Sequence, residues 1–284
     1  MRARVLDFLR HGGDVEAFAL ELFRWQVTVS PVHRDFAAGV EPTSLHEIPA
    51  VPVRLCRALV FCTSRQGVTF RTSGTTGERG VHMMADTEAY DVAARLHFEA
   101  CVTDPPPQAL NLCPRAADSS LGHMMRMLFP DATADAPSGE GPVFVATTAS
   151  RAAELPVMEL PPGSVVMVTG GFKGDSPEHL DLRAGLGPHF RRIDEYGMTE
   201  LSSQLWGAPG EGYLPPRWLV PYAVDPLSGE PTEGVGLLRF VDLANWSSLL
   251  AIETEDLGEV RGGRVFLQGR LQRAEPRGCS LAAE

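Results

Sequence analysis

The chain has 284 residues, of which 44% are hydrophobic and 21% are charged, a composition that is ordinary for a globular protein with one large domain or two lobes. Its formal net charge of −11 argues against a protein that binds nucleic acid backbones, because such a protein needs a basic face, whereas a nucleotide site needs only a few local cations. No apolar run approaches the ~20 residues of a membrane span, and five scattered cysteines without a CxxC pair favour reduced thiols in the cytoplasm.

The first part of the chain contains two predicted helices. One begins after Asp14, where apolar residues recur at helical spacing over 15–23. The segment 30–52 is rich in proline and turn residues, which predicts an extended connection. The second helix covers 86–101, starts at Asp86 or Thr87 and ends before a run of prolines.

Short apolar runs alternate with a helical stretch in the middle of the chain. A run at 109–113 is followed by a methionine-rich helical pattern at 121–129. Further apolar runs stand at 143–146 and 165–169, each bounded by glycine or proline. Strands that alternate with helices predict an α/β fold with a mostly parallel sheet, whose ligands bind beyond the carboxyl ends of the strands.

After about Trp206 the helical spacing largely disappears. Runs at 236–240, 249–252 and 264–267 indicate antiparallel strands, and we infer a smaller β-rich C-terminal lobe packed against the α/β lobe. The expected divisions are a helical and extended N-terminal segment at 1–65, the α/β lobe at 66–205 and the β-rich lobe at 206–284.

A run of small residues follows the strand-like piece at 68–70. Its members offer closely spaced backbone N–H groups and hydroxyls: Thr72, Ser73, Gly74, Thr75, Thr76 and Gly77. Because glycines let the main chain approach a ligand closely, the run predicts an oxyanion site, above all for phosphate. The common nucleotide loop would require Gly-Lys-Ser/Thr where Arg79, Gly80 and Val81 stand. A polar surface loop is the alternative.

A second glycine-containing loop follows the apolar run at 165–169. Gly170 and Gly171 would let a planar group lie against bare backbone, and Lys173 offers a cation. A plain β-turn explains the same residues equally well.

Two further stretches carry polar groups suited to a nucleotide. In the stretch 193–200, Tyr196 and Gly197 could border a base, Thr199 could bond a phosphate and Glu200 could hold a Mg²⁺ that bridges phosphate oxygens. Asp256 is predicted at a turn, where a carboxylate often binds ribose hydroxyls. A strand followed by a loop, and a surface acidic turn, are the respective alternatives.

The order of these motifs resembles the acyl-adenylate-forming superfamily, which includes acyl-CoA synthetases, luciferases and the adenylation domains of peptide synthetases. The motifs are Thr-Ser-Gly-Thr-Thr-Gly, Gly-Gly, Tyr-Gly-Met-Thr-Glu, Thr-x-Asp-Leu-Gly and Gly-Arg. Within the superfamily, the stretches 171–173, 196–204 and 269–281 look most like the acyl-protein synthetases. These are the fatty-acid-activating subunits of bacterial luminescence fatty-acid reductase complexes. The resemblance covers 48–281 and implies the large N-terminal domain of such enzymes.

The resemblance implies a role for each matching residue. The run 72–77 would cradle the phosphates of ATP, and Gly170, Gly171, Tyr196 and Gly197 would border the adenine. Thr199 would contact a phosphate, Glu200 would bind Mg²⁺, and Asp256 with Arg270 would hold the ribose. Cys279 stands where this family has a cysteine that accepts the acyl group as a thioester, and nearby arginines would favour its thiolate. An uninvolved free thiol is the alternative for Cys279.

Two departures from the superfamily pattern concern lysines. The chain has Glu78-Arg79-Gly80 where most members have Pro-Lys-Gly, and it lacks the lysine of their C-terminal lid, so Lys173 is the candidate substitute. The expected function is ATP-dependent activation of a fatty acid as acyl-AMP, transfer to Cys279, and onward transfer to a reductase partner. A ligase that uses coenzyme A or a carrier protein, and a relic that only binds nucleotide, are the alternatives. A hydrolase is disfavoured, since no Gly-x-Ser-x-Gly elbow occurs.

Overall fold

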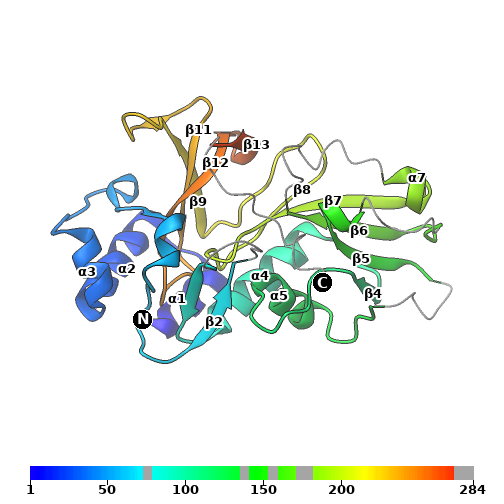
Figure 1. Ribbon diagram of the computed structural model, residues 1–284, viewed down its shortest axis with the longest axis horizontal. Helices are drawn as coiled ribbons and strands as arrows, with labels where there is room; N and C mark the ends of the chain where they lie inside the picture. The colour runs from blue at the N-terminus through cyan, green and yellow to red at the C-terminus, as the bar shows by residue number, and fades with distance from the viewer. Residues whose placement is uncertain (73–78, 135–140, 153–158, 171–181, 272–284) are drawn as a thin grey trace.

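A computed structural model describes residues 1–72, 79–134, 141–152, 159–170 and 182–271 of the chain. Figure 1 shows two sheets side by side, one flanked by helices α4 and α5 and the other by the N-terminal helices. Among the helices that these residues form, none is long and apolar enough to cross a bilayer. The mixed α/β architecture with a β-rich C-terminal part confirms the predicted fold class.

The first sheet is parallel except at one edge. It contains β4 (Gln108–Asn111), β5 (Val143–Thr148), β6 (Ser164–Thr169), β7 (Phe190–Tyr196) and β8 (Leu205–Gly207), in that spatial order. The first four strands are parallel and β8 is antiparallel to β7. Every residue of β5 and β6 is buried, which explains why their sequences are apolar runs without alternation.

Helices cover the first sheet. Helices α4 (Glu88–Cys101) and α5 (Ser120–Leu128) pack on one face through Phe98 and Met125, which share a core cluster with Phe144 of β5. The short helices α6 (Ala149–Ala152) and α7 (Arg183–Leu186) follow β5 and precede β7. The carboxyl ends of β6 and β7 therefore form one edge, at which the segments after Thr169 and Tyr196 emerge.

The second sheet is antiparallel apart from its first strand. It runs β1 (Val51–Pro52), β12 (Ala251–Arg261), β11 (Gly236–Asp242), β9 (Leu219–Val224) and β10 (Pro231–Thr232), and β13 (Arg264–Arg270) also pairs with β12. A separate hairpin of β2 (Val68–Arg71) and β3 (Val81–Met84) frames the predicted phosphate loop.

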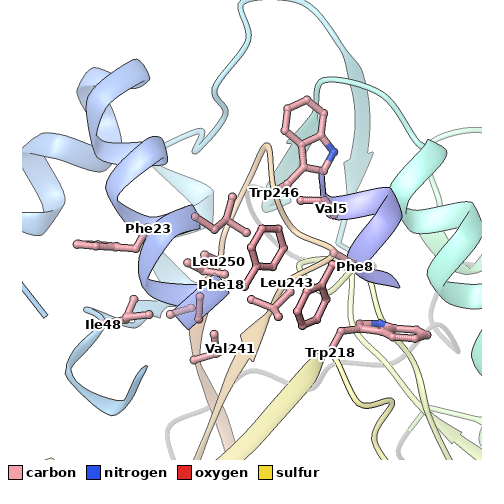
Figure 2. Packing of buried hydrophobic residues seen from close by; sticks show 14 of the residues in the cluster. Val5, Phe8, Phe18, Phe23, Ile48, Trp218, Val241, Leu243, Trp246 and Leu250 are labelled. Atoms are coloured by element: carbon pink, nitrogen blue, oxygen red, sulfur yellow. The ribbon is translucent and has the colours of Figure 1, made fainter. Parts of the chain in front are cut away.

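The N-terminal helices pack against the second sheet. They are α1 (Arg2–His11), α2 (Val15–Val29) and α3 (Pro31–Ala37). Figure 2 shows Phe8 and Phe18 gathered with Val241, Leu243 and Trp218, and the two phenylalanine rings are stacked with centroids 4.6 Å apart. This core extends from the first residues of the chain to β11, so the N-terminal segment is integral to the fold.

The helix starts agree with the sequence, two other expectations were wrong, and one helix was not predicted. Asp14 caps α2 by accepting a bond of 3.0 Å from the N–H of Ala17. Helix α1 was not predicted, because charged residues interrupt its short apolar pattern. The connection 30–52 is not simply extended, since it contains α3 and a 3₁₀ turn at Leu45–Glu47; a second 3₁₀ turn covers Val53–Arg57. Asp256 lies within β12 and not at a turn. The divisions at residues 65 and 205 stay predictions.

Candidate functional site

Three of the predicted nucleotide-binding residues lie together where the two sheets meet. Tyr196 ends β7, Asp256 lies in β12, and Arg270 ends β13 opposite Asp256 in register. The hydroxyl of Tyr196 donates to Oδ2 of Asp256 over 2.8 Å, and Nε of Arg270 lies 2.8 Å from Oδ1 of Asp256. One carboxylate thus connects the carboxyl edge of the parallel sheet with the antiparallel sheet.

The side chain of Thr254 fixes the backbone next to Asp256. The hydroxyl of Thr254 donates to the carbonyl of Leu238 over 2.8 Å and accepts from the N–H of Asp256 over 3.1 Å. Arg270 also donates to Oε2 of Glu255 over 3.1 Å. These bonds hold Asp256 and Arg270 in place while both side chains remain half-buried and within reach of solvent.

Aromatic contacts fix the ring of Tyr196. It stacks on Phe240 with centroids 5.9 Å apart and lies 5.8 Å from the ring of Tyr213. The phenol is therefore oriented from both ends, by its hydroxyl bond to Asp256 and by its ring contacts.

The segment after Tyr196 is anchored by a buried carboxylate. Asp242, at the end of β11, accepts from the N–H groups of Ser202 (2.9 Å), Ser203 (3.0 Å) and Ala244 (3.0 Å), and from the hydroxyl of Ser203 (2.8 Å). Burial raises the pKa of Asp242 to about 6, although the hydrogen bonds from Ser202, Ser203 and Ala244 lower it. Asp242 therefore determines the path of the chain next to Glu200.

Glu200 itself is buried, and its neighbour Thr199 is half-buried. The carbonyl of Glu200 accepts from Nδ2 of Asn245 over 2.8 Å. The amide of Gln26 on α2 donates to the carbonyl of Asn245 over 3.0 Å. Through Gln26, helix α2 therefore supports the loop that holds Glu200, in addition to its packing role. The signal in the sequence was a glutamine among the apolar residues of that helix.

The hairpin that frames the predicted phosphate loop is closed by specific bonds. The N–H of Thr72 donates to the carbonyl of Gly80 over 3.0 Å, and the N–H of Gly80 donates to the hydroxyl of Thr72 over 2.8 Å. Arg79 donates to the carbonyl of Thr72 over 2.6 Å and to Oδ2 of Asp118 over 2.9 Å. Arg79, which stands near the position of the missing lysine, thus secures the base of the loop.

The hairpin also touches the segment that contains Glu200. The hydroxyl of Ser202 donates to Sδ of Met84, the last residue of β3, over 3.4 Å. Met84 pairs with Val68 at the end of the hairpin away from the predicted phosphate loop, so this contact joins the Glu200 segment to the hairpin and not to the loop itself. Gly170 comes directly after β6 and has a φ of 75°, which suits glycine.

A second buried carboxylate lies at the same edge of the sheet. Glu195, next to Tyr196, accepts a hydrogen bond from the hydroxyl of Thr169. Burial raises the pKa of Glu195 to about 7, and the bond from Thr169 lowers it by less. Gly197 is exposed. It lies directly beside Glu195, since a Cβ at Gly197 would be 2.3 Å from Oε1 of Glu195. Sequence reasoning assigned no role to Glu195.

Several predicted site residues lie outside the described part of the chain, and their roles stay predictions. They are Ser73, Gly74, Thr75, Thr76, Gly77, Gly171, Lys173 and Cys279. Within the ranges that the structure does describe, no group of three or more His, Cys, Asp or Glu side chains could hold a metal ion. A hollow of ≈ 500 Å³ is lined by Ser164 and Phe190, at the amino ends of β6 and β7 and so at the opposite edge from Tyr196.

Comparisons with known proteins identify the fold. No protein-family model matches the chain, and no curated protein matches it in sequence. Among solved structures it is similar to ATP-bound MatB from Rhodopseudomonas palustris, at 13% identity and a TM-score of 0.53, over 71% of this chain and 47% of that one.

Two further structures match over the same share of this chain. The anthranilate CoA ligase AuaEII with anthranoyl-AMP matches at 14% identity with a TM-score of 0.52, over 71% of this chain and 46% of that one. MenE from Bacillus subtilis with ATP and a magnesium ion matches at 14% identity with a TM-score of 0.50, over 71% and 49%. The chain spans about half the length of these proteins. It has the mixed α/β fold of the matching half of these proteins.

Proposed function

We propose that the chain binds ATP and activates a carboxylic acid as an acyl adenylate, with release of pyrophosphate. The observation that carries the proposal is the set of Tyr196, Asp256 and Arg270, which come from three strands of two sheets and converge on one carboxylate. It lies at the carboxyl ends of parallel strands, where open α/β sheets bind ligands.

The geometry of Asp256 suits a ribose. An ionised carboxylate has about four acceptor sites; the hydrogen bond from Tyr196 uses one of them, and Nε of Arg270 forms an ion pair with Oδ1. The remaining sites can accept from two ribose hydroxyls. The guanidinium of Arg270 lies against this carboxylate and fixes its plane, while the ring of Tyr196 and the bare backbone at Gly197 suit a planar base.

The phosphates would extend from this nucleoside toward Thr72, at the base of the loop 72–77. Mg²⁺ in nucleotide sites is bound by one or two carboxylates together with phosphate oxygens, so a single carboxylate such as Glu200 is a sufficient protein ligand. The ion would neutralise charge on the phosphates and so stabilise the departing pyrophosphate. Thr199 stands next to Glu200 as the hydroxyl donor to a phosphate.

The proposed reaction is a displacement followed by an acyl transfer. An oxygen of the acid attacks the α-phosphorus of ATP, the bond to the β-phosphate oxygen breaks, and pyrophosphate leaves. A thiolate then attacks the acyl carbon, and AMP leaves with the acid's former oxygen. The chain's contribution is positioning and charge neutralisation.

The acid and the acceptor are finer parts of this proposal. The resemblance to acyl-protein synthetases names a fatty acid, Cys279 as acceptor and a reductase as partner. Coenzyme A is the competing acceptor, as the name of the anthranilate CoA ligase illustrates for that protein. A carrier-protein thiol is the third possibility.

The test is exchange of labelled pyrophosphate into ATP in the presence of Mg²⁺ and a panel of carboxylic acids. We expect exchange that depends on one class of acid and is strongly reduced in Asp256→Asn. ATP binding without exchange for any acid would instead support a protein that binds nucleotide and performs no activation.

A further inference from the structure

A second group of polar side chains lies on the opposite face of β7 from Tyr196. Successive side chains of a strand point to opposite faces, so Glu195 faces away from the Tyr196 set. Its register partners are Thr169 in β6 and Trp206 in β8, and side chains in register lie side by side on one face. Gln204 lies beside them, since its Cγ and Oε1 of Glu195 are both within 4 Å of the Cβ position at Gly197.

The hydrogen bonds within this group determine which of its polar atoms can still bind a ligand. The hydroxyl of Tyr90 donates its one hydrogen to the carbonyl of Ser120 over 3.1 Å, so it can only accept from the amide nitrogen of Gln204, which lies 3.1 Å away. The amide of Gln204 is thereby oriented. Its Oε1 is buried and has no hydrogen-bond partner among the described residues, and the same holds for Nε1 of Trp206.

These polar atoms are enclosed by apolar and aromatic side chains. Glu195 and Gln204 are each only 5% exposed, and the ring of Trp206 lies 5.5 Å from that of Phe98 in the core cluster beneath. Burial raises the pKa of Glu195 to about 7, so its charged form lacks full compensation in the ligand-free chain. A buried acceptor of this kind gains most from a donor that arrives with a ligand.

Gly197 lies next to the carboxyl of this group. This residue is exposed, and a Cβ there would fall 2.3 Å from Oε1 of Glu195 and 3.7 Å from Cγ of Gln204. Because Gly197 has no side chain, only its backbone can cover the carboxyl of Glu195. Gly197 directly follows Tyr196 in the chain, so a molecule bound at Glu195 would lie close to the proposed nucleoside.

We infer that Glu195 and Gln204 select the acid that is activated, and that this acid carries an amino group, as an amino acid or an aminoaryl acid does. The inference rests on the proposed function and names its substrate class. A carboxylate and an amide oxygen are both acceptors, so the complementary group is one with several N–H donors, which an amine has and an alkyl chain lacks. An unsubstituted acyl chain would leave Oε1 of Gln204 buried without a partner among the described residues, and the carboxyl of Glu195 with the bond from Thr169 alone.

The experiment is pyrophosphate exchange with matched pairs of acids that differ only in the amino group. The pairs are proteinogenic amino acids against their deamino analogues, aminobenzoic acids against benzoic acid, and 6-aminohexanoic against hexanoic acid, with tetradecanoic acid as the fatty acid. We expect one amino-bearing member to exceed its partner by about a hundredfold or more in kcat/KM, because sites built to bond a donor reject analogues without it.

Two variants connect this preference with Glu195. Glu195→Gln keeps the shape and still accepts from Thr169, and it should lower kcat/KM for the amino acid about a hundredfold while changing the deamino partner little. Gly197→Ala should reduce the same preference by displacing the carboxyl. Glu259→Gln, which alters a carboxylate on β12 that pairs with Arg261, is the control and should keep the preference.

The outcomes separate the inference from the proposed function. Exchange with tetradecanoic acid or other unsubstituted acids, and none with amino-bearing acids, overturns the inference and leaves the proposed function standing. An equal loss for both members of a pair in Glu195→Gln means that the residue serves folding and also overturns it. Exchange with no acid at all refutes the proposed function and the inference together.

Discussion

Replacement of Asp256 by asparagine tests the nucleoside site while disturbing its shape least. The substitution removes the charge that Arg270 faces and replaces one acceptor oxygen by an NH₂ group that cannot accept from a ribose hydroxyl. Hydrogen bonds to charged groups contribute about 1.5–3 kcal/mol each. The loss of one such bond predicts a Kd for ATP that is weaker by about 10- to 100-fold.

A lower stability of Asp256→Asn could also weaken ATP binding, and a second ion pair on the same strand provides a matched control for this effect. The Asp256–Arg270 pair has side-chain exposures of 15% and 26%. Glu253, on the same strand β12, pairs with Arg239 over 2.7 Å at exposures of 16% and 21%. Both Asp256→Asn and Glu253→Gln should lower the free energy of unfolding by about 1–2 kcal/mol.

Titration calorimetry with ATP and Mg²⁺ at neutral pH, on both variants and the parent chain, gives the decision. The expected result is weaker ATP binding in Asp256→Asn alone. Equal ATP affinity in Asp256→Asn and the parent would refute the ribose assignment. Equally weakened ATP binding in both variants would show that lower stability, and not a lost bond to the ribose, is the cause.

Three further predictions concern buried carboxylates and the acceptor. Asp242→Asn should lower the free energy of unfolding in urea by about 3 kcal/mol, because four donors then face a group with one acceptor atom; a loss below 1 kcal/mol would contradict this. Because the pKa of Glu195 is raised from its ordinary 4.5 to about 7, its stabilising contribution is complete below pH ~4.5 and lost as the pH rises through ~7, which amounts to about 3 kcal/mol. Relative to the parent, Glu195→Gln should therefore gain stability over that range in pH-dependent unfolding, and a parallel profile would argue against it. Cys279→Ser should spare pyrophosphate exchange and abolish covalent labelling by radioactive acid, and persistent labelling would exclude Cys279 as acceptor.

Local sequence patterns were sufficient to predict the parallel sheet and the loops that leave it. The apolar runs that became β5 and β6 are fully buried, so no alternation obscured them. Tyr196 was singled out because its ring could border a base, in a stretch that indicates a strand followed by a loop, and the structure has it as the last residue of β7.

Features that depend on distant partners were not predictable in this way. Asp256 was expected at a turn. Acidic residues are depleted in strands, yet arginines on the neighbouring strands, Arg239 and Arg270, pair with carboxylates of β12. The burial of Glu195 follows from its neighbours Thr169 and Trp206 in the sheet, which the order of the sequence does not reveal.

The most direct test of the central claim follows an oxygen atom through the reaction. The acid that supports pyrophosphate exchange is supplied with heavy oxygen in its carboxyl group, an acceptor thiol is provided, and the AMP formed is examined by mass spectrometry. Activation as an acyl adenylate predicts one heavy oxygen in each AMP, since the acid's oxygen stays on the phosphorus when the acyl group departs. AMP without heavy oxygen, or ADP and phosphate in its place, would contradict the account.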